Sequence, residues 1–492
     1  MSPLRRLASQ TAVYGVSSIL GRFLNYLLVP LYTYTFAPPE YGVVAEFYAY
    51  MGFLAVLLVF GLETGYFRFR SGGERPPEVV YATVLRFLVL ANGAFLAAAV
   101  LFSAPMSELL RHSGHPEYIW WCAAILAMDS VGAAAFARLR AENRAARFAA
   151  LKLIEIAANM GLNVFFILLC RQAFESDPGS TLGRLWDPAI GVGYVFLANL
   201  AASALKLVLL TPQFRDGLTG FDWGLFRRMI RYSLPMVLIG LAGIVNEMLD
   251  RAALKYLLPF DDQTNMAQLG IYSACYKLSI LMTLFIQAFR YAGEPFFFAY
   301  AKQTDATRIY ASVLNWFVIF CVFIFLLVTL YLDVFQYFVG SAYRDGLRVV
   351  PVLLLAQLLL GVYVNLSIWY KLTDRTLLGS YVSVAGAAIT VVLLFALVPR
   401  HGFEGAAWAH LACYGSMVLM SYLLGRRYYP VPYDLARVGG YVALGLALYG
   451  ASRVLVDALD FSALVIGTLL LALFLALVFL IDGRPLLKRA AS

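Results

Sequence analysis

The feature that most constrains this chain is a succession of long apolar segments, separated by short loops that carry most of its charges. A helix needs about 20 apolar residues to cross the hydrocarbon core of a bilayer. Windows of this length recur along the whole chain, and hydrophobic residues make up 62% of its 492 residues, whereas charged residues make up 14%. Since water-soluble domains are far more polar, the sequence predicts an all-α polytopic membrane protein.

The apolar windows predict about fourteen transmembrane helices. Their expected spans are residues 11–36, 41–65, 79–104, 118–138, 147–170, 188–211, 234–258, 269–293, 309–332, 347–370, 376–398, 402–425, 437–456 and 462–481. Six of them precede the longest loop, PQFRDGLTGFDWGLFRRMIRYS, six follow it, and two close the chain.

This grouping predicts the domain organisation. Residues 1–211 form an N-lobe with helices 1–6, and residues 212–233 form an amphipathic linker at the cytoplasmic membrane surface. Residues 234–425 form a C-lobe with helices 7–12, and residues 426–492 hold the last two helices and a cytoplasmic tail.

Lys and Arg predict the orientation, because short cytoplasmic loops accumulate these residues. Basic residues are more frequent in the loops that an N-in, C-in topology places inside, and we expect the first span to remain as a signal anchor in a bacterial inner membrane. The formal net charge of +9 lies in the loops, where sorting by positive charge and anionic lipid headgroups explain it. We therefore expect no nucleic-acid partner.

A weak internal repeat accompanies the grouping. YGVVAEFYAYMGFL from Tyr41 opens the second span, and LGIYSACYKLSILM from Leu269 opens the second span of the later half. Matches this short also arise by chance. A parallel repeat would place two pseudo-symmetric six-helix lobes around a central cavity.

Arg22 is the most unusual residue of the first span, because it stands near the middle with no acidic residue three or four positions away. A charge at such depth is costly and normally faces a partner or a watery cavity. One interpretation is that it binds an anionic ligand, since arginine grips phosphate through paired hydrogen bonds. The alternative is an ion pair that only locks helices together, with Glu46, Glu63 or Asp129 as partner.

Further charges lie inside other spans. The cations form a predicted binding set for an anionic headgroup, consisting of Arg22, Arg86, Lys152, Arg251 and Lys277. The acidic residues are candidates for ion coupling or charge balance, namely Asp129, Glu155, Glu247 and Asp250.

Helical spacing predicts local ion pairs between some of these charges. Glu247 stands four residues before Arg251, and Arg290 stands four before Glu294, so each pair lies on one helix face. The spacing therefore predicts two ion pairs within single helices.

Span five carries a polar stripe on one face, formed by Lys152, Glu155, Asn159 and Asn163. The stripe is either a seam of interhelical hydrogen bonds or one wall of a cavity.

Pro30 lies in the outer part of the first span and predicts a kink that serves as a hinge, because proline removes a backbone hydrogen bond. The chain has no GxxxxGK[ST] phosphate loop, and its five cysteines and four histidines show no metal-ligand spacing. We expect no cofactor, no metal and no enzymatic activity, which leaves transport.

The stretch LASQTAVYGVSSILGRFLNYLLVPLYTYTFAPPEYGVVAEFYAY, the fourteen spans and the Asp250–Arg251 step resemble the Wzx-type polysaccharide flippases. These belong to the MATE-like multidrug/oligosaccharidyl-lipid/polysaccharide exporter superfamily. The resemblance implies two six-helix lobes around a central cavity, two additional C-terminal helices, and alternating access. It also implies that Arg22, Arg251 and Lys277 line the cavity.

The substrate that the resemblance implies is a polyprenyl-diphosphate-linked oligosaccharide, moved from the cytoplasmic to the outer leaflet for cell-surface polysaccharide biosynthesis. Implied partners are membrane lipids and a polysaccharide polymerase or chain-length regulator. Three alternatives remain: a lipid II flippase of the same fold, a cation-coupled multidrug exporter, and a membrane glycosyltransferase or polymerase.

Overall fold

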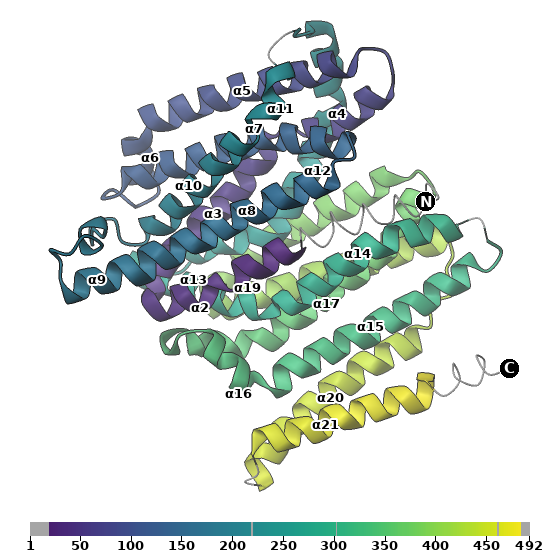
Figure 1. The fold of residues 1–492 in the computed structure, drawn as a ribbon. Coiled ribbons are helices and arrows are strands. Elements are labelled where there is room, and N and C mark those ends of the chain that lie inside the picture. Colours follow the sequence, from purple (N-terminus) through teal and green to yellow (C-terminus); the bar gives the residue numbers. More distant parts are fainter. Residues whose placement is uncertain (1–18, 218–219, 302, 460–461, 484–492) are drawn as a thin grey trace. The chain divides into compact units, whose positions relative to one another are not determined.

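The structure is a computed structural model that describes residues 19–217, 220–301, 303–459 and 462–483. Within these ranges the chain is α-helical, with short 3-10 and π-helical segments and no β-strand (Figure 1). The chain divides into two units, Met1–Ala252 and Ala253–Ser492, and the division falls inside helix α12. The predicted all-α fold is confirmed.

The first unit begins with a helical run over residues 19–26 and continues through α12. Its α-helices are α2 (Leu28–Thr35), α3 (Pro38–Leu58), α4 (Leu62–Ser71), α5 (Pro77–Leu101), α6 (Ser103–Leu109), α7 (Pro116–Ala141), α8 (Ala145–Asn163), α9 (Arg171–Ser176), α10 (Gly193–Leu209), α11 (Thr211–Phe214) and α12 (Trp223–Tyr256). A π-helical segment, η1 (Val164–Cys170), joins α8 to α9 without a break.

The second unit contains the longest helix of the chain. Its α-helices are α13 (Asp262–Tyr276), α14 (Ile280–Tyr300), α15 (Ala306–Leu330), α16 (Leu332–Phe335), α17 (Val350–Leu366), α18 (Ile368–Leu372), α19 (Thr376–Tyr428), α20 (Leu435–Leu459) and α21 (Ala463–Val478). A 3-10 segment, η6 (Ser341–Val349), leads into α17.

Among the described residues, 11 helical runs are long and apolar enough to cross a membrane. Of the remaining predicted spans, the sixth is α10, a shorter apolar helix, and the twelfth is the second arm of α19. The first span is helical over residues 19–26 and α2, while residues 11–18 lie outside the described part. The chain is a multi-pass membrane protein.

The two spans predicted over residues 376–398 and 402–425 are the two arms of α19, which meet at a kink. Gly402 has φ 59° and ψ −140°, which is non-helical backbone, and Pro399 lies three residues before it. Because only glycine adopts such dihedral angles without strain, the helix bends there. The predicted boundary between residues 398 and 402 coincides with this kink.

Helix α12 begins at Trp223, inside the segment predicted as a linker. Asp222 caps it, since its carboxylate accepts a hydrogen bond from the Leu225 N–H at 2.9 Å. In the first unit α12 packs on α3 and α4, where Gly52 lies against Met248, and Gly61 and Gly65 lie against Ser233. The second part of the predicted linker thus belongs to a long, packed helix.

Each unit has its own apolar core. In the first unit, buried residues of α4, α5, α7 and the start of α12 pack together, including Tyr66, Tyr81 and Met229. In the second, α17, α18 and α19 pack around Trp369, Tyr370 and Tyr414, and α20 and α21 lie on α15.

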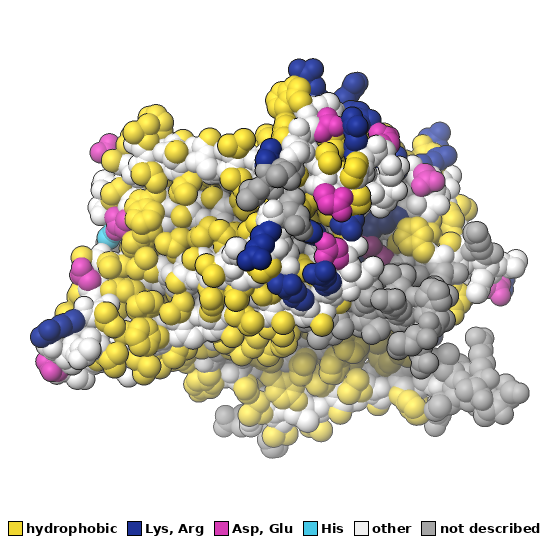
Figure 2. Space-filling model, turned by 45° about the horizontal axis from the view of Figure 1, so that its top comes forward, with side chains coloured by type: hydrophobic (Ala, Val, Ile, Leu, Met, Phe, Trp, Pro, Cys, Tyr) yellow, Lys and Arg dark blue, Asp and Glu magenta, His cyan; other side chains and the backbone are white. Residues whose placement is uncertain are grey.

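Large apolar side chains also cover much of the outer surface. Leu90, Leu101 and Leu377 are among many that are mostly exposed. Figure 2 shows that hydrophobic side chains dominate the visible face, with charged side chains confined to a few groups. A surface of this kind fits a lipid environment and is too apolar for water.

Candidate functional site

The first unit contains a network of charged side chains that connects three membrane-spanning helices. Lys206 of α10 forms ion pairs with Asp129 of α7 and with Glu155 of α8, the second at 2.6 Å. The Ser203 hydroxyl donates to the same Asp129 oxygen at 2.8 Å. We call Lys206, Asp129, Glu155 and Lys152 the N-unit ion cluster.

The cluster has one closed side and one open side. The Lys206 side chain is 3% exposed, whereas that of Asp129 is 45% exposed. Lys152 completes the cluster, since its ammonium lies 3.0 Å from Glu155 and 4.6 Å from the centre of the Phe136 ring. Two lysines and two carboxylates balance formally, so a proton or cation that reaches Asp129 changes the charge of the whole cluster.

The polar stripe of span five continues from this cluster as a seam of hydrogen bonds. Asn163 donates to the Asn159 carbonyl at 2.8 Å and accepts a hydrogen bond from the Tyr32 hydroxyl of α2 at 2.9 Å. Glu155 contributes through Lys206. Of the two interpretations of the stripe, the interhelical seam describes these contacts.

The first span runs parallel to α8 along this seam. A Cβ atom on Gly21 would meet the Ile156 side chain, Tyr32 reaches Asn163, and Arg171 donates to the Thr35 carbonyl at 2.9 Å. Successive residues of the first span therefore contact successive residues of α8 and the helical segments that follow it. These contacts fix the position of the helical turn that carries Arg22.

Arg22 is exposed on this helix and forms no ion pair with any residue that the structure describes. Each proposed locking partner is engaged elsewhere: Glu46 with His112 at 2.9 Å, Glu63 with Arg140, and Asp129 with Lys206. Among the described residues Arg22 therefore forms none of the three locking pairs, and its role as a ligand-binding residue stays a prediction. Within the described ranges Arg86, which is half-buried on α5, also lacks an ion pair.

The sequence and the structure were compared with those of known proteins. No family model and no curated protein sequence matches the chain. Solved structures do match: the lipid II flippase MurJ in an inward closed conformation has a TM-score of 0.69 at 12% identity, covering 97% of this chain and 100% of that one.

Multidrug transporters match over a smaller share. An inward-facing MATE family transporter of the MOP superfamily has a TM-score of 0.59 at 15% identity, covering 85% of this chain and 95% of that one. The MATE multidrug transporter DinF-BH in complex with R6G has a TM-score of 0.61 at 16% identity, covering 87% and 97%. The fold is MATE-like.

Within this MATE-like fold, the predicted Glu247–Arg251 ion pair is wrong. The Arg251 guanidinium lies 2.6 Å from the Asp250 carboxylate and reaches only the backbone carbonyl of Glu247. Asp250 and Arg251 are both buried, whereas Glu247 is exposed, so the neighbouring buried carboxylate is the better partner. The predicted Arg290–Glu294 pair is present at 3.4 Å, and Lys371 shares the same carboxylate.

Pro30 lies in α2, three residues after a break in the first helix. Residue 27 is a turn whose N–H is shared between the Phe23 and Leu24 carbonyls, at 3.3 and 3.0 Å. This irregularity is the expected effect of a proline, which has no N–H to offer residue 26. The role of Pro30 as a hinge stays a prediction, as does a ligand role for the half-buried Lys277.

Sequence reasoning missed two residues of the first unit. Lys206 stands near the end of its span, where a lysine is expected to extend to the membrane surface, and nothing local shows that α7 and α8 bring carboxylates to it. His112 stands in a loop, and only the fold brings it to the fully buried Glu46. The carboxylate partners of Lys206 and His112 come from other helices, and a single sequence does not show which helices lie side by side.

Proposed function

We propose that this protein is a flippase for a polyprenyl-diphosphate-linked oligosaccharide. The observation that carries the proposal is Arg22, an exposed guanidinium on an apolar helix with no carboxylate partner among the described residues. Such a charge is stabilised by an anionic ligand, and a diphosphate offers oxygens for paired hydrogen bonds. The likeness to a lipid II flippase over 97% of the chain supports the same class of substrate.

In this mechanism Arg22, with Arg86, binds the diphosphate, and the polyprenyl tail stays in lipid. Lys152 and Arg251 are held by Glu155 and Asp250, so they contribute positive charge less directly. The N-unit ion cluster couples a proton or cation through the open side at Asp129. The two lobes then alternate their access to the two leaflets, with Pro30 as a hinge.

Binding of the headgroup tests this proposal. Purified full-length protein in nanodiscs is titrated with a polyprenyl-diphosphate-linked oligosaccharide, in the wild type and in Arg22→Ala and Arg22→Lys. Loss of a charge-assisted hydrogen bond weakens affinity by roughly 10- to 100-fold in the alanine variant, and the lysine variant retains part of it. Arg144→Ala, which removes an exposed arginine paired with Glu142, is the control and leaves affinity unchanged. Unchanged affinity in both Arg22 variants contradicts the proposal.

A second candidate is transport of lipid II itself, because the MurJ structure matches the full length of both chains. Competition distinguishes the two, since a lipid II flippase binds lipid II in preference to other polyprenyl-diphosphate oligosaccharides. The MATE matches keep a drug exporter as a third candidate. That candidate requires binding of a cationic dye at a site that Arg22→Ala leaves intact.

A further inference from the structure

A second concentration of positive charge lies in the second unit, at the end of α19. The segment RRYYPVPYD, residues 426–434, closes this helix with Arg426 and Arg427 and then extends through two prolines. Arg375 precedes the first residue of the same helix. Since α19 bends back at Gly402, its two ends come together, and the Arg375 guanidinium lies 4.1 Å from the centre of the Tyr428 ring.

The three arginines contact aromatic rings and have no carboxylate partner among the residues that the structure describes. Tyr428 also faces the Arg427 guanidinium at 5.6 Å, and Arg426 lies 5.9 Å from the Tyr422 ring. Within the described part of the chain none of the three forms an ion pair, although Asp374 and Asp434 are exposed nearby in sequence. Neighbouring cations behave differently, since Lys371 pairs with Glu294 and Arg437 with Asp482.

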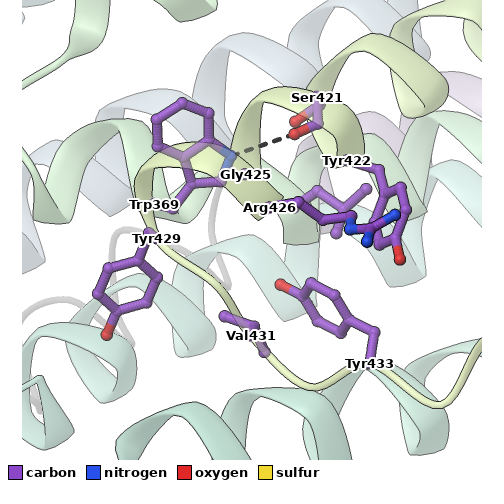
Figure 3. Close-up of a pocket in the computed structure, with 9 residues that line it drawn as sticks. Trp369, Ser421, Tyr422, Gly425, Arg426, Tyr429, Val431 and Tyr433 are labelled. Atoms are coloured by element: carbon purple, nitrogen blue, oxygen red, sulfur yellow. Dashed lines mark hydrogen bonds between the residues drawn. The ribbon is translucent and has the colours of Figure 1, made fainter.

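An aromatic pocket adjoins these arginines. Trp369 stacks on Tyr428 at 5.9 Å and forms one wall, with its indole N–H donating to the Ser421 carbonyl at 3.4 Å (Figure 3). The pocket is small, with a volume of about 10 Å³. Its lining residues are Leu366, Trp369, Ser421, Tyr422, Gly425, Arg426, Tyr429, Val431 and Tyr433. Figure 3 shows the Arg426 side chain beside Tyr422, with Tyr433 facing both across the pocket.

We propose that this surface, formed by Arg375, Arg426, Arg427 and the aromatic pocket beside them, binds the phosphate headgroup of an anionic membrane phospholipid. Guanidinium groups stacked on tyrosine rings keep their N–H edges free to bind phosphate oxygens. Three uncompensated positive charges at the end of a membrane helix attract anionic lipid. The tryptophan and tyrosines beside the arginines offer an aromatic surface on which the less polar part of the headgroup packs, as interfacial aromatic residues commonly do.

Apolar residues next to the arginines favour a lipid over free phosphate. Leu419 and Leu423 are 57% and 53% exposed, and they stand three to eight residues before Arg426 and Arg427 on the outer face of α19. On the other arm, Leu377 and Tyr381 are exposed next to Arg375. Acyl chains therefore have an apolar surface that continues directly from the phosphate site, which free phosphate does not use.

Lipid titration of the full-length protein tests the proposal. The protein in phosphatidylcholine nanodiscs is titrated with phosphatidylglycerol, and bound lipid is counted by native mass spectrometry. The variant R375Q/R426Q/R427Q is expected to bind about 100-fold more weakly, since each arginine near the surface contributes about one factor of five. The control R348Q/R400Q/R453Q removes three exposed arginines elsewhere in the second unit and changes net charge equally. It keeps the wild-type affinity.

Two results overturn the proposal. Equal phosphatidylglycerol binding by the wild type and R375Q/R426Q/R427Q shows that the surface holds no lipid. Displacement of the lipid by millimolar inorganic phosphate shows that the site recognises phosphate alone. Unchanged thermal unfolding of both triple variants confirms that folding is not the cause of any loss.

Discussion

The two units of this protein accommodate buried polarity in different ways. In the first, Lys206 holds two carboxylates from two other helices, and Glu46 holds His112. In the second, Gln357 of α17 links to α13 without charge by donating to the Tyr276 hydroxyl at 2.7 Å, while ion pairs such as Lys371–Glu294 and Arg437–Asp482 involve partly exposed side chains. The link among α7, α8 and α10 in the first unit is therefore ionic, whereas the link between α13 and α17 in the second unit is neutral.

This difference shows where a proton or cation is able to influence the protein. A neutral amide and a phenol keep their charge over the physiological pH range. A carboxylate that shares one ammonium with a second carboxylate exchanges protons or cations with consequences for both partners. We therefore predict that the first unit carries any ion coupling, and the following variants test this prediction.

The largest effect is expected from Lys206→Met. Removing the ammonium leaves Asp129 and Glu155 without their shared partner, and breaking a buried ion pair costs about 3 kcal/mol. We expect a large decrease in the midpoint of thermal unfolding in detergent. The triple variant D129N/E155Q/K206M removes the uncompensated charge and recovers most of the loss. A midpoint for Lys206→Met equal to the wild type contradicts the role of the cluster.

An intermediate effect is expected from Gln357→Leu in the second unit. The substitution removes the hydrogen bond to the Tyr276 hydroxyl and a long one, 3.5 Å, from the Thr283 hydroxyl, at a cost of about 1 kcal/mol. The unfolding midpoint should fall clearly less than in Lys206→Met, when both are measured at one heating rate. A larger fall in Gln357→Leu reverses the comparison between the units.

The smallest effect concerns the two helix caps outside the membrane spans. Hydrogen bonds from the Leu225 N–H and then the Arg75 charge lower the pKa of Asp222, and the Thr264 hydroxyl and N–H lower the pKa of Asp261. Each carboxylate therefore adds stability above its ordinary pKa of 3.8, and this stability is lost as the pH falls through the lowered value. Asp261→Asn should flatten the acid side of the pH profile of unfolding slightly, and an unchanged profile contradicts this assignment.

Much of the fold follows from hydropathy alone, because every long apolar window has to become a membrane helix. The structure differs where local backbone chemistry decides a boundary. Gly402 joins two predicted spans through a kink, and the Asp222 cap starts α12 well before the membrane segment predicted from residue 234. Neither effect changes the average hydropathy of a window.

The site was less predictable, because its partners come from different helices. Spacing correctly gave Arg290 and Glu294, which are four residues apart on α14, yet it gave the wrong partner for Arg251. Burial decided that case, since Asp250 is enclosed and Glu247 is exposed. Lys206 had no signal in its own helix, because both of its partners are more than 50 positions away in sequence.

Transport in proteoliposomes tests the central claim most directly. A fluorescent polyprenyl-diphosphate-linked oligosaccharide is placed in the membrane, and its appearance in the opposite leaflet is followed with the wild type, Arg22→Ala and the Arg144→Ala control. We predict transfer by the wild type and the control, and a loss of at least about 10-fold in Arg22→Ala. Equal transfer by Arg22→Ala, or none by the wild type in either orientation and with either an imposed proton or sodium gradient, contradicts the account.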